Sequence, residues 1–153
     1  YEGDIAPERV AYLAGLLKGI GVQRVDVADT IGVGTPRKVQ RAIEATLQHF
    51  GIDAISGHFH DTYGQALSNT LAALELGVWN FQASVAGLGG CPYAKGATGN
   101  VATEDVVFML HGMGIETGID LDKLVDAGAY ISDYLGRKPN SRVAVAVLNK
   151  RAG

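Results

Sequence analysis

The chain of 153 residues has the length of one domain and a formal charge of −3, so neither a nucleic-acid backbone nor an anionic membrane is an expected partner. Apolar residues make up 47% of the chain, as in a soluble globular protein, and no apolar run approaches the roughly 20 residues that cross a bilayer. The single cysteine excludes an internal disulfide, which suits a reducing compartment. The 21 glycines predict many sharp turns or close backbone approaches.

The opening residues Tyr1-Glu2-Gly3-Asp4 include no initiator methionine and show neither a signal peptide nor a transit sequence. We therefore expect the chain to begin inside a loop of a longer protein. Its targeting signals would then lie outside the sequence.

A helix precedes the first predicted strand. It begins at Pro7 and stops at Gly21, because glycine adopts the left-handed conformation of a helix end at little cost. Its apolar positions recur at helical spacing and share one face: Val10, Leu13, Leu17 and Ile20. A short strand is expected over residues 24–28.

The second helix begins at Thr35-Pro36, where threonine suits the N-cap and proline the first turn, and it ends at Gly51. Its predicted apolar face comprises Val39, Ile43, Leu47 and Phe50. The second strand is expected over residues 54–59, and a helix follows over residues 65–76. Gly77 is the stop of that helix.

The third strand is expected over residues 80–85, followed by a glycine-rich loop over residues 86–100. Thr103 is the predicted cap of the next helix, and Asp120 caps a last helix over residues 121–135. The tail over residues 143–148 fits either a helix or a strand, and a helix is favoured because no partner strand is evident. Trp79 and Phe81 are interpreted as core residues.

The predicted strands begin about 26 to 30 residues apart and each is followed by a helix, which is the spacing of a β-α repeat. Alternating strands and helices predict a parallel sheet covered by helices. A doubly wound sheet and a barrel both satisfy this pattern. Three or four units are too few to close an eight-stranded barrel, so a barrel would be present only in part.

The residues that can do chemistry follow the predicted strands. Asp29 follows the first strand, His58 and His60 end the second, and the loop that contains Cys91 follows the third. In α/β barrels and in open α/β sheets, active sites lie at the carboxyl ends of the strands. This shared position indicates a functional site more strongly than any single motif does.

His58 and His60 are two residues apart on a strand, so their imidazoles face the same side while Phe59 faces the helices. This arrangement can chelate a divalent metal; the alternative is two histidines satisfied by hydrogen bonds at a strand end. Asn100 would add an amide oxygen. Mixed nitrogen and oxygen ligation favours Mg, Mn or Zn, and a further carboxylate ligand is expected.

Cys91 lies in a glycine-rich loop near this predicted cation and near Lys95, which favours acid–base or nucleophilic work over inert packing. The run after Asp29 is not a nucleotide loop, because the third glycine of G-x-G-x-x-G would fall at Arg37 and no G-K-[ST] follows. Asp29 is interpreted as a site carboxylate, with an Asx turn as the alternative.

Two pairs of charged residues have simpler interpretations. Glu104 and Asp105 are interpreted as helix-start electrostatics and nothing more. Arg137 and Lys138 could meet a phosphate, although a pair of solvated charges is the commoner case.

Residues 87–105, with the run Gly-Leu-Gly-Gly-Cys-Pro-Tyr-Ala-Lys-Gly, resemble the signature loop of hydroxymethylglutaryl-CoA lyases. Residues 29–36 and 58–67 resemble two further blocks of that family, so the likeness extends across nearly the whole chain. Isopropylmalate and homocitrate synthases belong to the same wider group of metal-dependent barrels. They usually lack the cysteine loop and have Asn-Asp after the second histidine, where this chain has Asp61-Thr62, so the lyase is favoured.

The resemblance implies that residues 1–153 are the C-terminal part of a (β/α)8 TIM barrel, with about three β-α units plus C-terminal helices and with the N-terminal strands missing. It implies that His58, His60 and Asn100 bind Mg²⁺ or Mn²⁺. Cys91 would help to protonate the departing acetyl-CoA enolate, Asp29 would lie near the substrate hydroxyl, and His58 would take part in proton transfer.

The implied reaction cleaves 3-hydroxy-3-methylglutaryl-CoA, an acyl-CoA, into acetoacetate and acetyl-CoA. The resemblance also implies a homodimer for the full-length protein and a cytoplasmic location of the bacterial type, with mitochondrial targeting left open. The family's aspartate ligand and its catalytic arginine and glutamate lie in the early strands, so this chain alone is expected to be inactive. Gly136 replaces a residue that is often polar near the CoA, which leaves contacts there open.

Two alternatives remain at this point. One is an acyl-CoA-condensing synthase of the isopropylmalate or homocitrate type, which forms the bond that the lyase breaks. The other is a non-catalytic metal-binding fragment that acts only through assembly.

Overall fold

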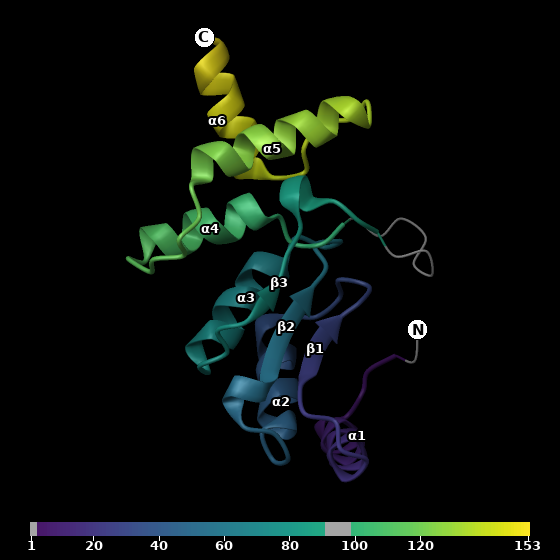
Figure 1. The fold of residues 1–153 in the computed structure, drawn as a ribbon. Helices are drawn as coiled ribbons and strands as arrows, with labels where there is room; N and C mark the ends of the chain where they lie inside the picture. The colour runs from purple at the N-terminus through teal and green to yellow at the C-terminus, as the bar shows by residue number, and fades with distance from the viewer. Residues whose placement is uncertain (1–2, 91–98) are drawn as a thin grey trace.

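The computed structural model describes residues 3–90 and 99–153, so Cys91 and Lys95 lie outside the described residues. In chain order the elements are α1 (Pro7–Gly19), β1 (Val25–Asp29), α2 (Pro36–Thr46), the 3₁₀ turn η1 (Ile52–Ala54), β2 (Ile55–Phe59), α3 (Ala66–Glu75), β3 (Phe81–Gln82), the 3₁₀ turn η2 (Val85–Gly87), α4 (Thr103–Gly112), α5 (Leu121–Tyr134) and α6 (Arg142–Ala152) (Figure 1).

The three strands form one parallel sheet in the order β1-β2-β3. In its register Asp29 lies opposite Phe59, and His58 lies opposite Gln82. Figure 1 shows α2 and α3 behind the sheet and α4, α5 and α6 stacked beyond the strand arrowheads. The predicted fold class is confirmed: parallel β-α units are followed by C-terminal helices.

The face of the sheet that meets the helices is apolar. Ile55 and Phe59 of β2 are 2% and 1% exposed, and they pack in one cluster with Val39 and Ile43 of α2. Full burial of a side chain of this size stabilises the fold by roughly 1.5–3 kcal/mol relative to exposure. This cluster fixes which strand positions face the helices and which face the other way.

The second face of the sheet is polar. Asp26, Ser56 and Gln82 occupy alternate strand positions on the same side as His58, according to the register. The Ser56 hydroxyl donates a hydrogen bond to Asp26 Oδ1, and Gln82 Nε2 donates to the same oxygen at 3.0 Å. These residues were not among the predicted site residues, although their alternation with apolar neighbours was a usable signal.

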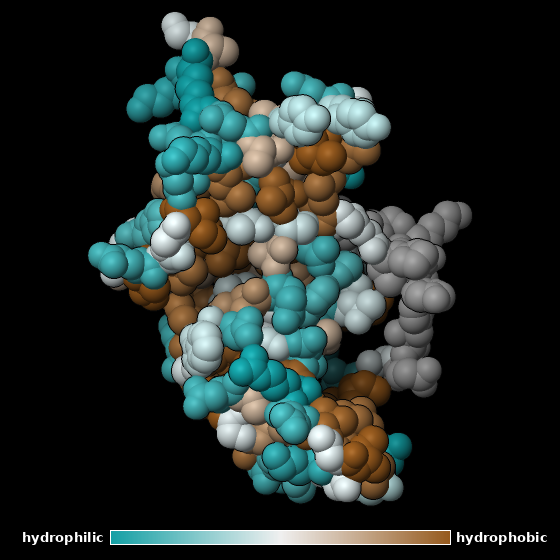
Figure 2. All heavy atoms as spheres, in the orientation of Figure 1, coloured by the Kyte–Doolittle hydropathy of each residue, from teal (hydrophilic) through white to brown (hydrophobic). Residues whose placement is uncertain are grey.

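Helix α1 packs through smaller residues than the sequence predicted. Ala14 is 5% exposed, whereas Leu13 and Ile20 are 55% and 79% exposed, so the predicted apolar face is wrong at these two positions. The approach to α2 is close, because a Cβ at Gly15 would lie 3.0 Å from the His49 ring. Figure 2 shows hydrophobic residues gathered on the surface where α1 lies.

The third strand is shorter than predicted. β3 covers only Phe81–Gln82, because the Ser84 N–H donates to Val101 O at 3.1 Å and the chain then turns into η2. The interpretation of Trp79 as core is also wrong: its side chain is 62% exposed, and Nε1 donates to Asp53 Oδ1 at 3.1 Å. Leu47 is likewise exposed, at 37%.

Helix ends follow the predictions in part. Asp120 caps α5 as predicted and accepts hydrogen bonds from the Asp122 and Lys123 N–H groups. Thr35 is at the N-cap of α2 as predicted, but its side chain makes no capping hydrogen bond. The cap of α4 is Ala102, so the assignment of Thr103 is wrong by one residue. The helical interpretation of the tail is confirmed by α6.

Candidate active site

The two histidines of the His-x-His motif stack against each other at the carboxyl end of β2. The ring centroids of His58 and His60 lie 5.5 Å apart, with an angle of 22° between the ring planes. Phe59 between them is buried in the apolar cluster on the other side of the sheet. The alternation of a strand therefore presents two imidazoles on one side, as the sequence predicted.

Asn100 lies beside this histidine pair. His60 and Asn100 form an antiparallel β-bridge, and the Val101 N–H donates to Phe59 O at 3.0 Å. The side-chain nitrogen of Asn100 donates to Leu88 O at 3.0 Å. Its Oδ1 atom is buried and accepts no hydrogen bond from the residues that the structure describes. A buried carbonyl oxygen without a donor is unfavourable, so this atom is positioned for a ligand.

These three side chains fit a divalent cation. Imidazole nitrogen and amide oxygen suit Mg, Mn or Zn, and Asn100 Oδ1, which accepts no hydrogen bond from the described residues, is available as a third donor on the residue bridged to His60. Within residues 3–90 and 99–153, no cluster of three His, Cys, Asp or Glu side chains could hold a metal. The donors here are thus two histidines and one asparagine, which leaves room for the predicted carboxylate ligand.

Asp29 lies at the end of β1, and its carboxylate holds its own loop. It accepts hydrogen bonds from the N–H groups of Val33 at 3.1 Å and Gly34 at 2.8 Å. A Cβ at Gly34 would lie 2.8 Å from Asp29 Oδ2, so glycine permits this close approach. The register places Asp29 opposite Phe59, on the side away from His58, and its carboxylate does not join the histidine pair. Its catalytic role stays a prediction.

Glu104 and Asp105, at the start of α4, do more than compensate the helix dipole, which corrects the sequence interpretation. Glu104 is fully buried, and both carboxylate oxygens accept from the Ala86 N–H, at 2.9 and 3.0 Å. Burial raises the pKa of Glu104, and the N–H groups of Glu104 and Ala86 oppose that rise. Asp105 accepts from Ser141 Oγ at 2.7 Å and from the Val143 N–H at 2.9 Å, so it caps α6.

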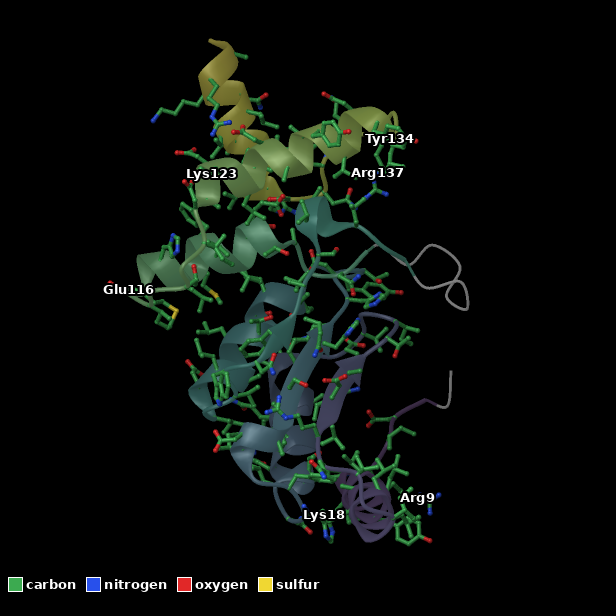
Figure 3. The ribbon with its side chains drawn as sticks, viewed as in Figure 1. Arg9, Lys18, Glu116, Lys123, Tyr134 and Arg137 are labelled. Carbon is green, nitrogen blue, oxygen red and sulfur yellow. The ribbon has the colours of Figure 1, made fainter. Side chains whose placement is uncertain are left out.

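A cleft of about 680 Å³ extends from Asn100 to the start of α6. Its polar lining includes Asp61, Asn100, Asp105, Asn140, Arg142 and Asn149. Arg137 and Lys138 are exposed beyond the end of α5 and do not line the cleft; Figure 3 shows Arg137 there beside Tyr134. The cleft therefore meets the candidate cation site at Asn100 and extends from there to α6.

The fold and the site together define part of a TIM barrel with a candidate metal site at the carboxyl ends of its strands. The chain belongs to the HMGL-like family, whose sequence profile matches residues 1–131. This confirms the resemblance to hydroxymethylglutaryl-CoA lyases inferred from the loop around Cys91.

Individual relatives agree with this assignment. The mitochondrial hydroxymethylglutaryl-CoA lyase of Bos taurus is 53% identical over 146 residues, which is 95% of this chain and 45% of the relative. The crystal structure of the hydroxymethylglutaryl-CoA lyase from Pseudomonas aeruginosa superposes with a TM-score of 0.91 at 53% identity, over 98% of this chain and 50% of the other. The chain therefore spans about half the length of the relatives that it matches.

A third relative carries ligands. The HMG-CoA lyase from Acinetobacter baumannii, solved in complex with coenzyme A and 3-methylmalate, superposes with a TM-score of 0.90 at 39% identity. The match covers 95% of this chain and 48% of that structure. Among the described residues, no helix is long and apolar enough to cross a membrane.

Proposed function

We propose that the protein containing this chain is a divalent-metal-dependent carbon–carbon lyase that cleaves 3-hydroxy-3-methylglutaryl-CoA into acetyl-CoA and acetoacetate. One observation carries the proposal: Asn100, whose buried Oδ1 accepts no hydrogen bond from any described residue, is bridged to His60, and the His60 ring stacks on that of His58. Family membership supports it, because relatives that are 53% identical are named for this activity.

His58, His60 and Asn100 would hold Mg²⁺ or Mn²⁺ at the carboxyl end of β2. When bound, the metal supplies positive charge that polarises the hydroxyl and carboxylate oxygens of the substrate. Asp29 is proposed to lie near the tertiary hydroxyl as the candidate proton acceptor, and His58 is proposed to take part in the proton transfer as well as in metal binding. Cys91 is the proposed proton donor at carbon, and it lies outside the described residues.

The proposed cleavage of the C–C bond requires no oxidant or reductant. The hydroxyl loses its proton to a base, the C–C bond breaks, and the electron pair moves into the thioester as an enolate. The hydroxyl carbon becomes the ketone of acetoacetate. One proton delivered to the enolate carbon gives acetyl-CoA. The protein must therefore provide one base, one acid and a stabiliser of negative charge.

The cleft from Asn100 to α6 is the proposed channel for the CoA arm of the substrate. Its lining offers Arg142, Asn140 and Asn149 to an anionic, hydrogen-bonding chain. The relative from A. baumannii binds coenzyme A, which supports an acyl-CoA as the ligand of this fold. Gly136 offers no side chain to this ligand, so any contact at that position would involve backbone.

Activity is proposed for the assembled barrel and not for this chain alone. β1 pairs only with β2 among the described strands, and a cavity of about 560 Å³ lies beside it, lined by apolar residues such as Val27 and Phe59 and by charged ones such as Lys38 and Arg41. An open edge of this kind calls for further strands. We propose that residues 1–153 are part of one barrel domain whose other strands supply the remaining ligand, in a homodimeric cytoplasmic enzyme.

The test joins this chain to the N-terminal half of the Pseudomonas aeruginosa lyase and measures acetoacetate release with added Mg²⁺ or Mn²⁺. We expect metal-dependent release that stops on chelation and falls at least a hundredfold in His58→Ala and Cys91→Ala. His111→Ala is the matched control, because His111 is exposed and contacts Thr117 Oγ1 at 2.9 Å, away from the site.

The same hybrid distinguishes the rival functions. Release of free CoA from acetyl-CoA and a 2-oxo acid, without acetoacetate production from hydroxymethylglutaryl-CoA, would establish the synthase instead. Metal binding by a folded hybrid that turns over neither substrate would establish the non-catalytic alternative.

A further inference from the structure

A buried carboxylate lies behind the proposed metal ligand Asn100 and is not part of the proposed chemistry. Glu104 has no exposed surface, and both oxygens accept from the Ala86 N–H. Gly128 of α5 closes the pocket on the other side, because a Cβ there would lie 2.5 Å from Glu104 Oε1. The fold therefore holds this carboxylate tightly against one backbone donor.

The donor of this hydrogen bond, the Ala86 N–H, belongs to a strained turn. Ala86 has φ 56° and ψ 18°, and among the described residues it is the one non-glycine with positive φ. Such a left-handed conformation is unfavourable for a residue with a Cβ atom, so it persists where surrounding contacts hold it. The hydrogen bond to a carboxylate is charge-assisted and is roughly twice as strong as a neutral one, which offsets this strain. Glu104 thus holds η2 in its observed conformation.

The turn η2 sets the position of the Leu88 carbonyl. The Leu88 N–H donates to Val85 O at 3.1 Å, so Leu88 follows directly from η2. Leu88 O then accepts from Asn100 Nδ2 at 3.0 Å and from the Ser84 hydroxyl at 2.5 Å. Because the nitrogen of the Asn100 amide is held by Leu88 O, the oxygen of the same amide must face the other way. That oxygen is the buried Oδ1 proposed as a metal ligand.

We propose that Glu104 is a positioning residue for the metal site: it holds the turn at Ala86 so that Leu88 O fixes the orientation of the Asn100 amide. The inference rests on the proposed metal function of Asn100. It differs from a purely structural role, in which Glu104 would stabilise the contact of α4 with α5 and leave Asn100 unaffected.

Asp120 provides a control carboxylate away from the site. It caps α5 by accepting hydrogen bonds from the Asp122 and Lys123 N–H groups, and it does not line the cleft that contains Asn100. Asp120→Ala should therefore lower thermal stability without changing Asn100. A general loss of stability and a specific effect on the ligand can then be separated.

The experiment uses the hybrid described above with selectively ¹⁵N-labelled asparagine and measures two quantities. One is the Asn100 side-chain amide resonance, identified by its absence in Asn100→Ala; the other is Mn²⁺ affinity from the electron paramagnetic resonance signal of the free ion. In Glu104→Ala we expect the Asn100 resonance to shift and Mn²⁺ affinity to fall about 10–100-fold, which is the usual effect of losing an outer partner of a metal ligand.

Two further variants keep the test decisive if Glu104→Ala does not fold. Glu104→Gln retains an acceptor for the Ala86 N–H and should keep Mn²⁺ affinity within about threefold, since a neutral amide accepts more weakly than a carboxylate but in the same place. Gly128→Ala pushes the carboxylate away from Ala86 without altering it, so it should reduce affinity as Glu104→Ala does. Alanine also has a higher helix propensity than glycine, so Gly128→Ala does not weaken α5 itself.

An unchanged Asn100 resonance and unchanged Mn²⁺ affinity in folded Glu104→Ala or Gly128→Ala would overturn the positioning role. An equal loss of affinity in Asp120→Ala would also overturn it. Failure of the metal proposal gives a different result: the wild-type hybrid would bind Mn²⁺ no better than Asn100→Ala, while the Asn100 resonance would still report the orientation of its amide.

Discussion

Two carboxylates hold loops at the carboxyl end of the sheet, and they do so over very different distances along the chain. Asp29 is partly buried and accepts from N–H groups four and five residues ahead. Glu104 is fully buried and reaches back 18 residues to Ala86. A local turn can form by itself, whereas the second contact exists only after η2, α4 and α5 have packed together. The region around Asn100 thus depends on tertiary structure more than the region around Asp29 does.

The largest effect on stability is expected at Gly99, where the packed region around Asn100 leaves no space for a side chain. A Cβ at Gly99 would overlap Gly87 O and lie 2.9 Å from Gly89 O. Both obstacles are backbone atoms, so Gly99→Ala should lower the free energy of unfolding by more than about 4 kcal/mol and abolish tight Mn²⁺ binding. Urea denaturation of the hybrid measures the first effect.

Gly112→Ala is the control for this change, because Gly112 lies in α4 and a Cβ added there would meet no atom within 4 Å. It should leave stability unchanged or raise it by up to about 1 kcal/mol. Similar losses in the two variants would show that the base of the glycine-rich loop is not specially crowded.

Truncating the two carboxylates compares the regions directly. Glu104→Ala leaves the buried Ala86 N–H without an acceptor and opens a cavity, so we expect a loss of about 2 kcal/mol in the free energy of unfolding. Asp29→Ala should cost about 1 kcal/mol, because water can reach the released N–H groups. Equal losses of unfolding free energy in urea denaturation would show that the local contacts of Asp29 and the long-range contact of Glu104 stabilise the fold to the same extent.

The pH dependence of stability should have opposite signs for a buried and an exposed carboxylate. Burial raises the pKa of Glu104 above the ordinary 4.5, so the folded state binds its proton more tightly than the unfolded state does. The stability that this proton contributes is complete below pH 4.5 and is lost as pH rises through the folded pKa. Relative to Glu104→Gln, the wild type should therefore lose stability as pH rises above that value.

Asp120 is the exposed carboxylate in this comparison, and its pKa shifts in the direction opposite to that of Glu104. The Lys123 N–H, and then the Lys123 side chain, lower the pKa of Asp120 below the ordinary 3.8. Its contribution is present above pH 3.8 and is lost as pH falls through the lower folded pKa. Stability curves of Glu104→Gln and Asp120→Asn, each measured against the wild type, should thus slope in opposite directions, and parallel slopes would contradict the assignment.

Sequence patterns predicted those parts of the molecule that depend on neighbouring residues. The spacing of His58 and His60 on a strand indicated their common side, and Asp120 before a helical pattern indicated the cap of α5. The β-α order predicted the parallel sheet, because a parallel connection needs the length of a helix. The first two inferences require only a few consecutive residues, and the third requires only the order of neighbouring elements.

The predictions from sequence were wrong where contacts with residues far away in the chain determine the structure. Glu104 has the position of an ordinary acidic residue in a first helical turn, and nothing nearby in the sequence indicates Ala86 or Gly128 as neighbours. Leu13 fits the helical spacing of a packed face, yet it is exposed, because the close contact of α1 with α2 uses Ala14 and Gly15. Periodicity indicates that a face exists, and packing determines which face is covered.

The smallest effect on stability is expected for Asp29→Asn, a substitution that distinguishes a loop-holding role of Asp29 from a catalytic role. In Asp29→Asn the amide oxygen still accepts from the Gly34 N–H while the charge is lost, so stability should fall by only about 0.5 kcal/mol. If the carboxylate only holds the loop, acetoacetate release by the hybrid should remain within about threefold of the wild type. A catalytic base loses its function with its charge, so kcat should then fall by at least about a hundredfold at unchanged stability. A large fall in kcat would show that binding of the substrate or assembly of the barrel turns this carboxylate from its loop towards the site, and an unchanged kcat would exclude Asp29 as the base.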